Sequence, residues 1–378
     1  MIINNVKLVL ENEVVSGSLE VQNGEIRAFA ESQSRLPEAM DGEGGWLLPG
    51  LIELHTDNLD KFFTPRPKVD WPAHSAMSSH DALMVASGIT TVLDAVAIGD
   101  VRDGGDRLEN LEKMINAIEE TQKRGVNRAE HRLHLRCELP HHTTLPLFEK
   151  LVQREPVTLV SLMDHSPGQR QFANREKYRE YYQGKYSLTD AQMQQYEEEQ
   201  LALAARWSQP NRESIAALCR ARKIALASHD DATHAQVAES HQLGSVIAEF
   251  PTTFEAAEAS RKHGMNVLMG APNIVRGGSH SGNVAASELA QLGLLDILSS
   301  DYYPASLLDA AFRVADDESN RFTLPQAVKL VTKNPAQALN LQDRGVIGEG
   351  KRADLVLAHR KDNHIHIDHV WRQGKRVF

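Results

Sequence analysis

The stretch PGLIELHTD, residues 49–57, decides the fold because it combines a buried-strand pattern with three polar side chains at alternate positions. Glu53, His55 and Asp57 are two residues apart, and side chains two apart along a β-strand point to the same face. The residues between them then lie on the opposite face. The stretch therefore predicts a strand with one packed face and one face that can hold a metal ion.

Strand-sized apolar runs continue outward from this stretch and alternate with segments of helical periodicity, of which 105–124 is the clearest. Such alternation is typical of a parallel α/β architecture. The eight predicted strands are 47–55, 89–97, 132–139, 157–164, 223–229, 245–250, 266–271 and 295–301. Eight strands indicate a (β/α)8 TIM barrel.

Polar groups follow most of these runs, and a barrel of this type carries its chemistry at the C-terminal ends of its strands. Six of the eight ends carry a carboxylate or an imidazole: Glu53, His55, Asp57, Glu138, Asp164, His165, His229, Asp230, Asp231, Glu249 and Asp301. Any one of them is explained by a helix cap or a satisfied core group. Several buried carboxylates together disfavour folding unless cations accompany them, so the set predicts a metal cluster.

The two ends of the chain have a different pattern, short alternating strands with the turn Asn23-Gly24 near the start. Residues 1–48 and 344–378 are predicted to form one small β-sandwich domain, and 49–343 the barrel. A polar, Tyr- and Gln-rich segment at about 171–212 is too long for a plain connection, which predicts a helical insertion.

Composition excludes several classes of protein. The chain has 378 residues, 41% hydrophobic and 24% charged, with no apolar run that could cross a membrane and a first segment unlike a secretory signal. A net charge of −10 argues against nucleic-acid binding. Two cysteines, Cys137 and Cys219, fit a reducing compartment, so we expect a cytoplasmic protein. The oligomeric state stays open, a homo-oligomer included.

Three motifs, LLPGLIELHTD, HLRCE and NPAQALNLQDRGVIGEGKRADLVL, resemble the amidohydrolase superfamily, and the resemblance covers nearly the whole chain. It implies a metal-bearing barrel with two divalent ions, zinc or manganese, and a β domain built from both termini. The implied metal ligands are His55, Asp57, Glu138, His165, His229 and Asp301. Asp301 is also the implied general base.

This sequence departs from the superfamily pattern at three places. Asp57 replaces the second histidine of the usual His-x-His pair, the fourth strand lacks a lysine, and Glu249 lies near the place of the expected sixth-strand histidine. An additional oxygen ligand favours a somewhat harder ion than an all-histidine site would.

The segments HDDATH, AEFPTTFEAA and MGAPNIVRGGSHSGN resemble members that hydrolyse a phosphorylated ribose carrying a triphosphate, with release of pyrophosphate. The residues expected to bind this small-molecule substrate are Arg66, Arg170, Arg276, Gly277, Gly278 and Ser279. The glycines would aim backbone N–H groups at phosphate, although such a turn can equally be a plain loop. Two alternatives stay open, an amidase or deaminase on the same scaffold and an inactive binding protein.

Overall fold

A computed structural model describes residues 1–99, 107–279 and 282–378. These residues group into two compact units. Unit 1 comprises Met1–Asp94, Met114–Arg132 and Met269–Phe378, and unit 2 comprises Ala95–Lys113 and Leu133–Leu268. The predicted boundaries between β domain and barrel, at 48/49 and 343/344, stay predictions.

One sheet is the predicted parallel, nearly closed eight-stranded barrel, with strand order β13-β12-β11-β10-β9-β8-β7-β6. Each strand overlaps one predicted run. The bounds are β6 (Leu51–Thr56), β7 (Ile89–Ile98), β8 (Glu130–Glu138), β9 (Val157–Met163), β10 (Ala225–His229), β11 (Ile247–Glu249), β12 (Asn266–Gly270) and β13 (Ile297–Ser299). Within unit 1, a parallel bridge between Thr56 and Asp301 joins the ends of the first and last of these strands.

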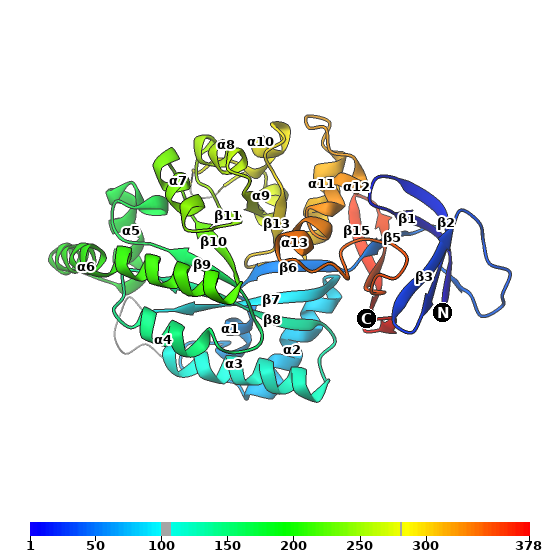
Figure 1. Cartoon of the computed structure of the whole chain (residues 1–378), viewed down its shortest axis with the longest axis horizontal. Coiled ribbons are helices and arrows are strands. Elements are labelled where there is room, and N and C mark those ends of the chain that lie inside the picture. The colour runs from blue at the N-terminus through cyan, green and yellow to red at the C-terminus, as the bar shows by residue number, and fades with distance from the viewer. Residues whose placement is uncertain (100–106, 280–281) are drawn as a thin grey trace. The chain divides into compact units, whose positions relative to one another are not determined.

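Helices alternate with the barrel strands, as the periodicity predicts (Figure 1). The predicted helix at 105–124 is α3 (Arg107–Arg124), and residues 105 and 106 lie outside the described residues. The others are α1 (Asn58–Phe63), α2 (Ala73–Ala86), α4 (Thr144–Leu151), α5 (Arg175–Tyr186), α6 (Asp190–Arg222), α7 (His234–Gln242), α8 (Phe254–Lys262), α9 (Ala271–Arg276), α10 (Ala286–Gln291), α11 (Ser306–Asp316), α12 (Leu324–Lys329) and α13 (Lys333–Ala338). Across the described ranges, none of these helices has both the length and the hydropathy needed to cross a membrane.

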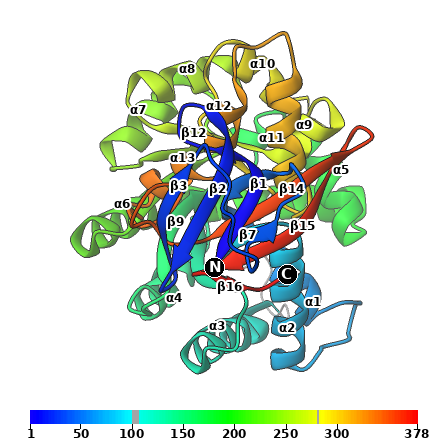
Figure 2. The ribbon, with the colours of Figure 1, turned by 90° about the vertical axis from the view of Figure 1, so that its right-hand side faces the viewer.

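The second sheet, in unit 1, is built from both ends of the chain, as predicted. Its order is β16-β15-β14-β5-β1-β2-β3, with β4 paired to β1. The bounds are β1 (Ile2–Val9), β2 (Val14–Gln22), β3 (Glu25–Ala30), β4 (Met40–Asp41), β5 (Trp46–Pro49), β14 (Leu355–Lys361), β15 (His364–Arg372) and β16 (Lys375–Arg376). Figure 2 shows the N-terminal strands beside the C-terminal ones, and their buried side chains, Trp371 and Ile3 among them, share one core.

The predicted first barrel strand, 47–55, is in fact two strands. β5 pairs with β14 in the terminal sheet, whereas β6 pairs with β7 in the barrel, and Gly50 separates them. A Cβ atom at Gly50 would lie 2.1 Å from Thr90 Oγ1. The hydrophobic run continues without a break because both strands are buried, so the sequence pattern alone does not show where the chain leaves one sheet for the other.

The residues predicted as a helical insertion, 171–212, lie in unit 2 in a short 3-10 turn (Arg170–Phe172), α5 and most of α6, which continues to Arg222. Figure 1 shows α5 and α6 as neighbouring helices, and they pack through a cluster of buried aromatic side chains that includes Tyr178 and Tyr182. The Asn174 side chain caps α5, and Thr189 starts α6 with a capping box.

Candidate metal centres

The first candidate centre lies in unit 1, where β6 and β13 end. His55 is the last but one residue of β6 and is almost fully buried, and its Nε2 atom lies 3.7 Å from Asp57 Oδ2 and 3.8 Å from Asp301 Oδ1. These separations are too long for hydrogen bonds. Two oxygens and one nitrogen thus converge on one point, as the ligands of a cation do.

The backbone turn after each strand supports this convergence. Asp301 follows β13 with a φ of 54°, a left-handed conformation that is uncommon for residues other than glycine and that Asp and Asn adopt more readily than most. The Asp301 N–H donates to the carbonyl of His55 over 3.1 Å. The turn therefore holds the Asp301 carboxylate, which is about one third exposed, beside the His55 ring.

The second candidate centre lies in unit 2, after β9 and β10. His165 Nε2 lies 3.6 Å from Asp230 Oδ2, and His229 Nε2 lies 3.3 Å from the same oxygen. Asp230 also has a left-handed backbone, with φ 56°, and its N–H donates to the Glu249 carbonyl over 3.0 Å. Two imidazoles and one carboxylate again converge on a single point.

Two buried glutamates contact the other side of these imidazoles. Glu138, at the end of β8, accepts a 2.6 Å hydrogen bond from His165 Nδ1, and Glu249, at the end of β11, accepts one of 2.7 Å from His229 Nδ1. An imidazole that donates its Nδ1–H to a carboxylate carries the Nε2 lone pair that a metal ion binds. The structure thus places Glu138 beside Nδ1 of His165. The direct metal ligand that the resemblance implies at Glu138 stays a prediction.

Two carboxylates, those of Glu138 and Asp230, lie next to His165 in unit 2. Burial alone would lower the pKa of His165, but the carboxylates of Glu138 and Asp230 raise it to about 10. Burial likewise would raise the pKa of Glu138, and the neighbouring imidazoles His165 and His229 hold it below its ordinary value. Two carboxylates beside a buried imidazole thus favour one positive charge here, either a proton on His165 or a divalent ion that replaces it.

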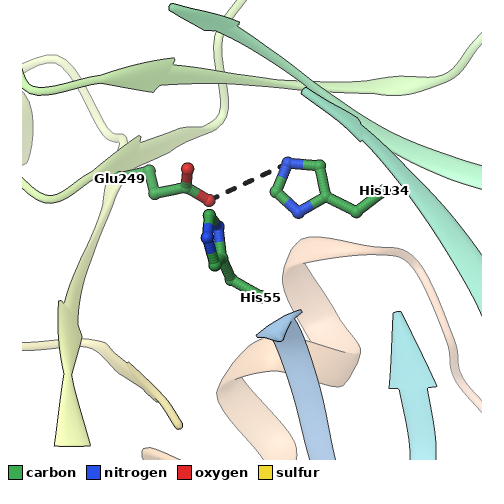
Figure 3. Close-up of side chains that lie close together, drawn as sticks. All are labelled: His55, His134 and Glu249. Atoms are coloured by element: carbon green, nitrogen blue, oxygen red, sulfur yellow. Dashed lines mark ion pairs between the residues drawn. The ribbon is translucent and has the colours of Figure 1, made fainter. Parts of the chain in front are cut away.

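Glu249 has a second neighbour in the same unit. Its Oε2 atom lies 3.9 Å from His134 Nε2, as Figure 3 shows with a dashed line, and the same His134 nitrogen lies 2.9 Å from Ser161 Oγ. Both Glu249 and His134 are fully buried. Glu249 therefore connects two histidines from β8 and β10 through one carboxylate.

Both clusters fit divalent cations by their chemistry. Each offers imidazole nitrogen and carboxylate oxygen within 4.8 Å of one another, a mixed donor set that suits zinc or manganese. His55, Asp57 and Asp301 would hold one ion, and His165, His229 and Asp230 the other. Five of the six metal ligands implied by the sequence thus lie in these clusters or their turns, and Glu138 lies one contact away.

A third histidine cluster does not fit a metal. His80, Asp94 and His131 lie in the interior of unit 1, joined by hydrogen bonds of 2.6 Å and 2.8 Å. Asp81 closes the other side of His131 at 2.9 Å. These separations are hydrogen-bond distances, so the ring nitrogens are already engaged, and we interpret this group as a structural ion-pair network.

The predicted phosphate-binding cations lie in different surroundings. Arg66 and Arg276 are exposed. Arg170 is buried in unit 2, where its Nε donates to Asp231 Oδ1 over 3.1 Å. An arginine already paired in this way has less charge to offer a substrate phosphate.

The glycine-rich turn differs from its predicted role. Gly277 and Gly278 follow α9 and close its C-terminal end, with Gly277 in a left-handed conformation of φ 82°. The Gly277 N–H donates to the Ile274 carbonyl and the Gly278 N–H to the Asn273 carbonyl, so these donors belong to the helix end. Ser279 follows them, half-buried, and a contact from it to substrate stays a prediction.

The sequence pattern places Asp230 and Glu249 at strand ends, but neither is among the metal ligands that the resemblance implies. The signal was present in each case. Asp230 directly follows the implied ligand His229, and Glu249 is the acid on the strand next to it. Their roles depend on which ring nitrogen they face, and a strand pattern does not specify this.

The fold recurs in solved structures of low sequence identity. N-acetyl-D-glucosamine-6-phosphate deacetylase from Mycobacterium smegmatis matches with a TM-score of 0.63 at 16% identity, covering 100% of this chain and 100% of that chain. The corresponding deacetylase from Thermotoga maritima gives 0.60 at 15% identity, with 100% and 99% covered. 5-Methylcytosine deaminase from Klebsiella pneumoniae gives 0.56 at 16% identity, with 100% and 98% covered.

The sequence itself matches one family over most of its length. Residues 82–378 match the amidohydrolase family, which is more than half of the chain and includes every barrel strand after the first as well as the C-terminal strands of the second sheet. The chain therefore belongs to the amidohydrolase family.

Proposed function

We propose that this chain is a metal-dependent diphosphatase that hydrolyses α-D-ribose 1-methylphosphonate 5-triphosphate to the 5-phosphate and pyrophosphate, in the carbon–phosphorus lyase pathway of phosphonate use. The support is twofold. The chain is an amidohydrolase by family, and its segments HDDATH, AEFPTTFEAA and MGAPNIVRGGSHSGN resemble the diphosphatase of that pathway. In this proposal the protein is cytoplasmic, and its partner is the phosphorylated ribose.

The observation that carries a metal-dependent hydrolase is the pair of clusters, one in each unit, in which imidazole and carboxylate atoms converge at distances of 3.3–3.8 Å. Divalent ions bound there would lower the pKa of water and neutralise phosphoryl oxygens. A triphosphate is highly anionic, and its hydrolysis depends mainly on such charge stabilisation.

The protein's own groups have defined tasks in this reaction. The Asp301 carboxylate, about one third exposed, accepts a proton from the attacking water. At the same time the oxygen of that water forms a bond to the phosphorus next to the ribose. The bond from that phosphorus to the bridging oxygen breaks, and pyrophosphate leaves with that oxygen. Exposed Arg66 and Arg276 are the cations that we assign to the departing phosphates.

The test offers the purified protein two classes of substrate. The ribose triphosphate and a panel of cyclic amides and aminated bases are incubated separately, with pyrophosphate and ammonia measured in parallel. Pyrophosphate from the triphosphate alone supports the proposal. Amide or amine turnover without pyrophosphate would overturn it.

A second candidate function is the hydrolysis of an amide or the deamination of a base, and a specific observation favours it. The similar structures include two deacetylases and a deaminase, although at 15–16% identity they establish the fold alone. The substrate panel decides between the two reactions.

An inactive scaffold is the third possibility, and metal content separates it from both enzymes. We expect about two equivalents of zinc or manganese to remain after dialysis, one for each cluster. Removal of the ions with a chelator should abolish turnover, and their return should restore it. A protein with no ion and no gain of activity on adding either metal is the scaffold.

A further inference from the structure

Glu53 has an unusual set of partners for a buried carboxylate. It lies in the middle of β6, its exposed fraction is 0%, and it is surrounded by buried strand residues. Its Oε1 atom accepts the backbone N–H of His55 over 2.7 Å, and its Oε2 atom accepts the backbone N–H of Ser300 over 2.6 Å. One carboxylate therefore joins β6 to Ser300, which is 247 residues from Glu53 in the sequence.

Each of these backbone groups adjoins a residue of the unit 1 cluster. His55 itself supplies the imidazole, and Ser300 directly precedes Asp301. The Asp301 N–H donates to the His55 carbonyl, so the Glu53 bonds and this bond form a continuous backbone connection between β6 and β13.

Packing alone does not explain a carboxylate at position 53. Burial of an unpaired carboxylate costs several kcal/mol, and a leucine of similar size would fill the space without that cost. The two short N–H bonds offset part of it, and a side chain whose two oxygens each accept a backbone N–H group fixes the relative position of those groups. The cost of burying the Glu53 carboxylate is explained if the unit 1 cluster requires a fixed position of His55 relative to Asp301.

We propose that Glu53 is a positioning residue that sets the distance between His55 and Asp301 and thereby the metal affinity of the unit 1 cluster. This inference rests on the proposed metal-dependent function. In this role Glu53 acts through the backbone, because each of its oxygens accepts a backbone N–H group at the end of β6 or just after β13.

The test compares E53Q with wild type for metal binding in the folded protein. A glutamine offers one carbonyl oxygen, so its NH2 group faces the second N–H and one of the two bonds is lost. We expect the affinity of one of the two ions to fall about 10–100-fold, and the ion in the unit 2 cluster to stay. Bound cobalt is measured by absorption during titration, and retained zinc by elemental analysis after dialysis against a chelator.

The matched control is D81N. Asp81 is also a buried carboxylate that accepts two backbone N–H groups, those of Arg128 at 2.8 Å and Ala129 at 2.9 Å. The side chains that it contacts, His131 and Arg128, belong to neither candidate centre. D81N should lose stability, measured by denaturant unfolding of the metal-free protein, and keep wild-type affinity for both ions.

The outcomes separate the two proposals. A wild-type protein that binds no ion overturns the proposed function. A wild type that binds two ions, with E53Q binding both equally well, overturns only the role of Glu53. If E53Q does not fold, E53D is measured in the same metal titration. Its shorter side chain cannot reach both N–H groups, so its affinity should also fall. Wild-type affinity in E53D would again refute the role of Glu53.

Discussion

Asp94 accepts a 2.8 Å hydrogen bond from Nδ1 of His131, and both side chains are buried in the interior of unit 1. Asp81 accepts from the other ring nitrogen of His131 at 2.9 Å, and His80 contacts the second Asp94 oxygen at 2.6 Å. Arg128, 3.7 Å from Asp81, is the further charged group facing this network. His131 is thus an imidazolium held between two carboxylates.

The charge state of His131 predicts how stability depends on pH. Burial alone would lower the pKa of His131, but Asp94 and Asp81 raise it from 6.5 to about 9. A raised pKa adds stability that is fully present below pH 6.5 and is lost as pH rises through 9. We expect the free energy of unfolding to fall by at most about 3 kcal/mol between pH 6.5 and 9.5, measured by urea unfolding at each pH.

The control for that pH dependence is H131Q, which should unfold more easily at pH 6.5 and show a much flatter profile toward pH 9.5. D94N should cost about 3–5 kcal/mol, because it leaves buried imidazoles without their shared anion. A wild-type stability that stays constant up to pH 9.5 would contradict a charged His131.

D301N should reduce turnover by about two to four orders of magnitude and leave the fold intact, because an amide cannot accept the proton of the attacking water and is a weaker ligand for a divalent cation than a carboxylate is. Asn tolerates the left-handed conformation that Asp301 adopts, so backbone strain is not a confounding cause. Steady-state kinetics with circular dichroism checks both parts. The matched control is D362N, at an exposed Asp with a φ of 56°, and a wild-type rate in D301N would remove Asp301 from the mechanism.

D230N should remove one ion and leave the other. Asp230 Oδ2 is the oxygen toward which His165 Nε2 and His229 Nε2 both point, and a neutral amide is a weaker ligand for a divalent cation. Elemental analysis after dialysis should give about one equivalent, with turnover lower by an order of magnitude or more. Two equivalents in D230N would show that Asp230 is not a ligand.

G50A should destabilise the protein by about 1–3 kcal/mol, because the new methyl group overlaps Thr90, whose Oγ1 would be 2.1 Å away. Adding T90A should restore part of the loss, since it removes the nearest atoms. G184A, in helix α5, is the control and should be neutral or slightly stabilising, because among the described residues the new methyl meets nothing within 4 Å apart from its own helix backbone. Equal unfolding free energies for G50A and wild type would contradict the close approach of Gly50 and Thr90.

The fold was predictable because its signals are local. Each barrel strand overlaps a predicted apolar run, although β11 and β13 are only three residues long. Glu53 and His55 lie in β6, and Asp57 directly follows its last residue. Polar and apolar residues alternate clearly enough at the two ends of the chain to indicate a shared sheet. A hairpin turn indicates antiparallel neighbours, as β5 and β14 are, but it does not indicate the parallel pairing of β1 with β5. The break at Gly50 was not predictable, because burial on both sides hides it.

The sequence by itself determined which side chains stand at the strand ends and on which face, since period-two alternation is a property of the backbone. Only the tertiary structure decided what each of them contacts: Glu138 and Glu249 face the Nδ1 atoms of histidines, Asp230 faces their Nε2 atoms, and Glu53 binds backbone N–H groups. The reason is distance along the chain. Glu53 and Ser300 are 247 residues apart, and no local pattern encodes a hydrogen bond that exists only once the last barrel strand lies beside the first.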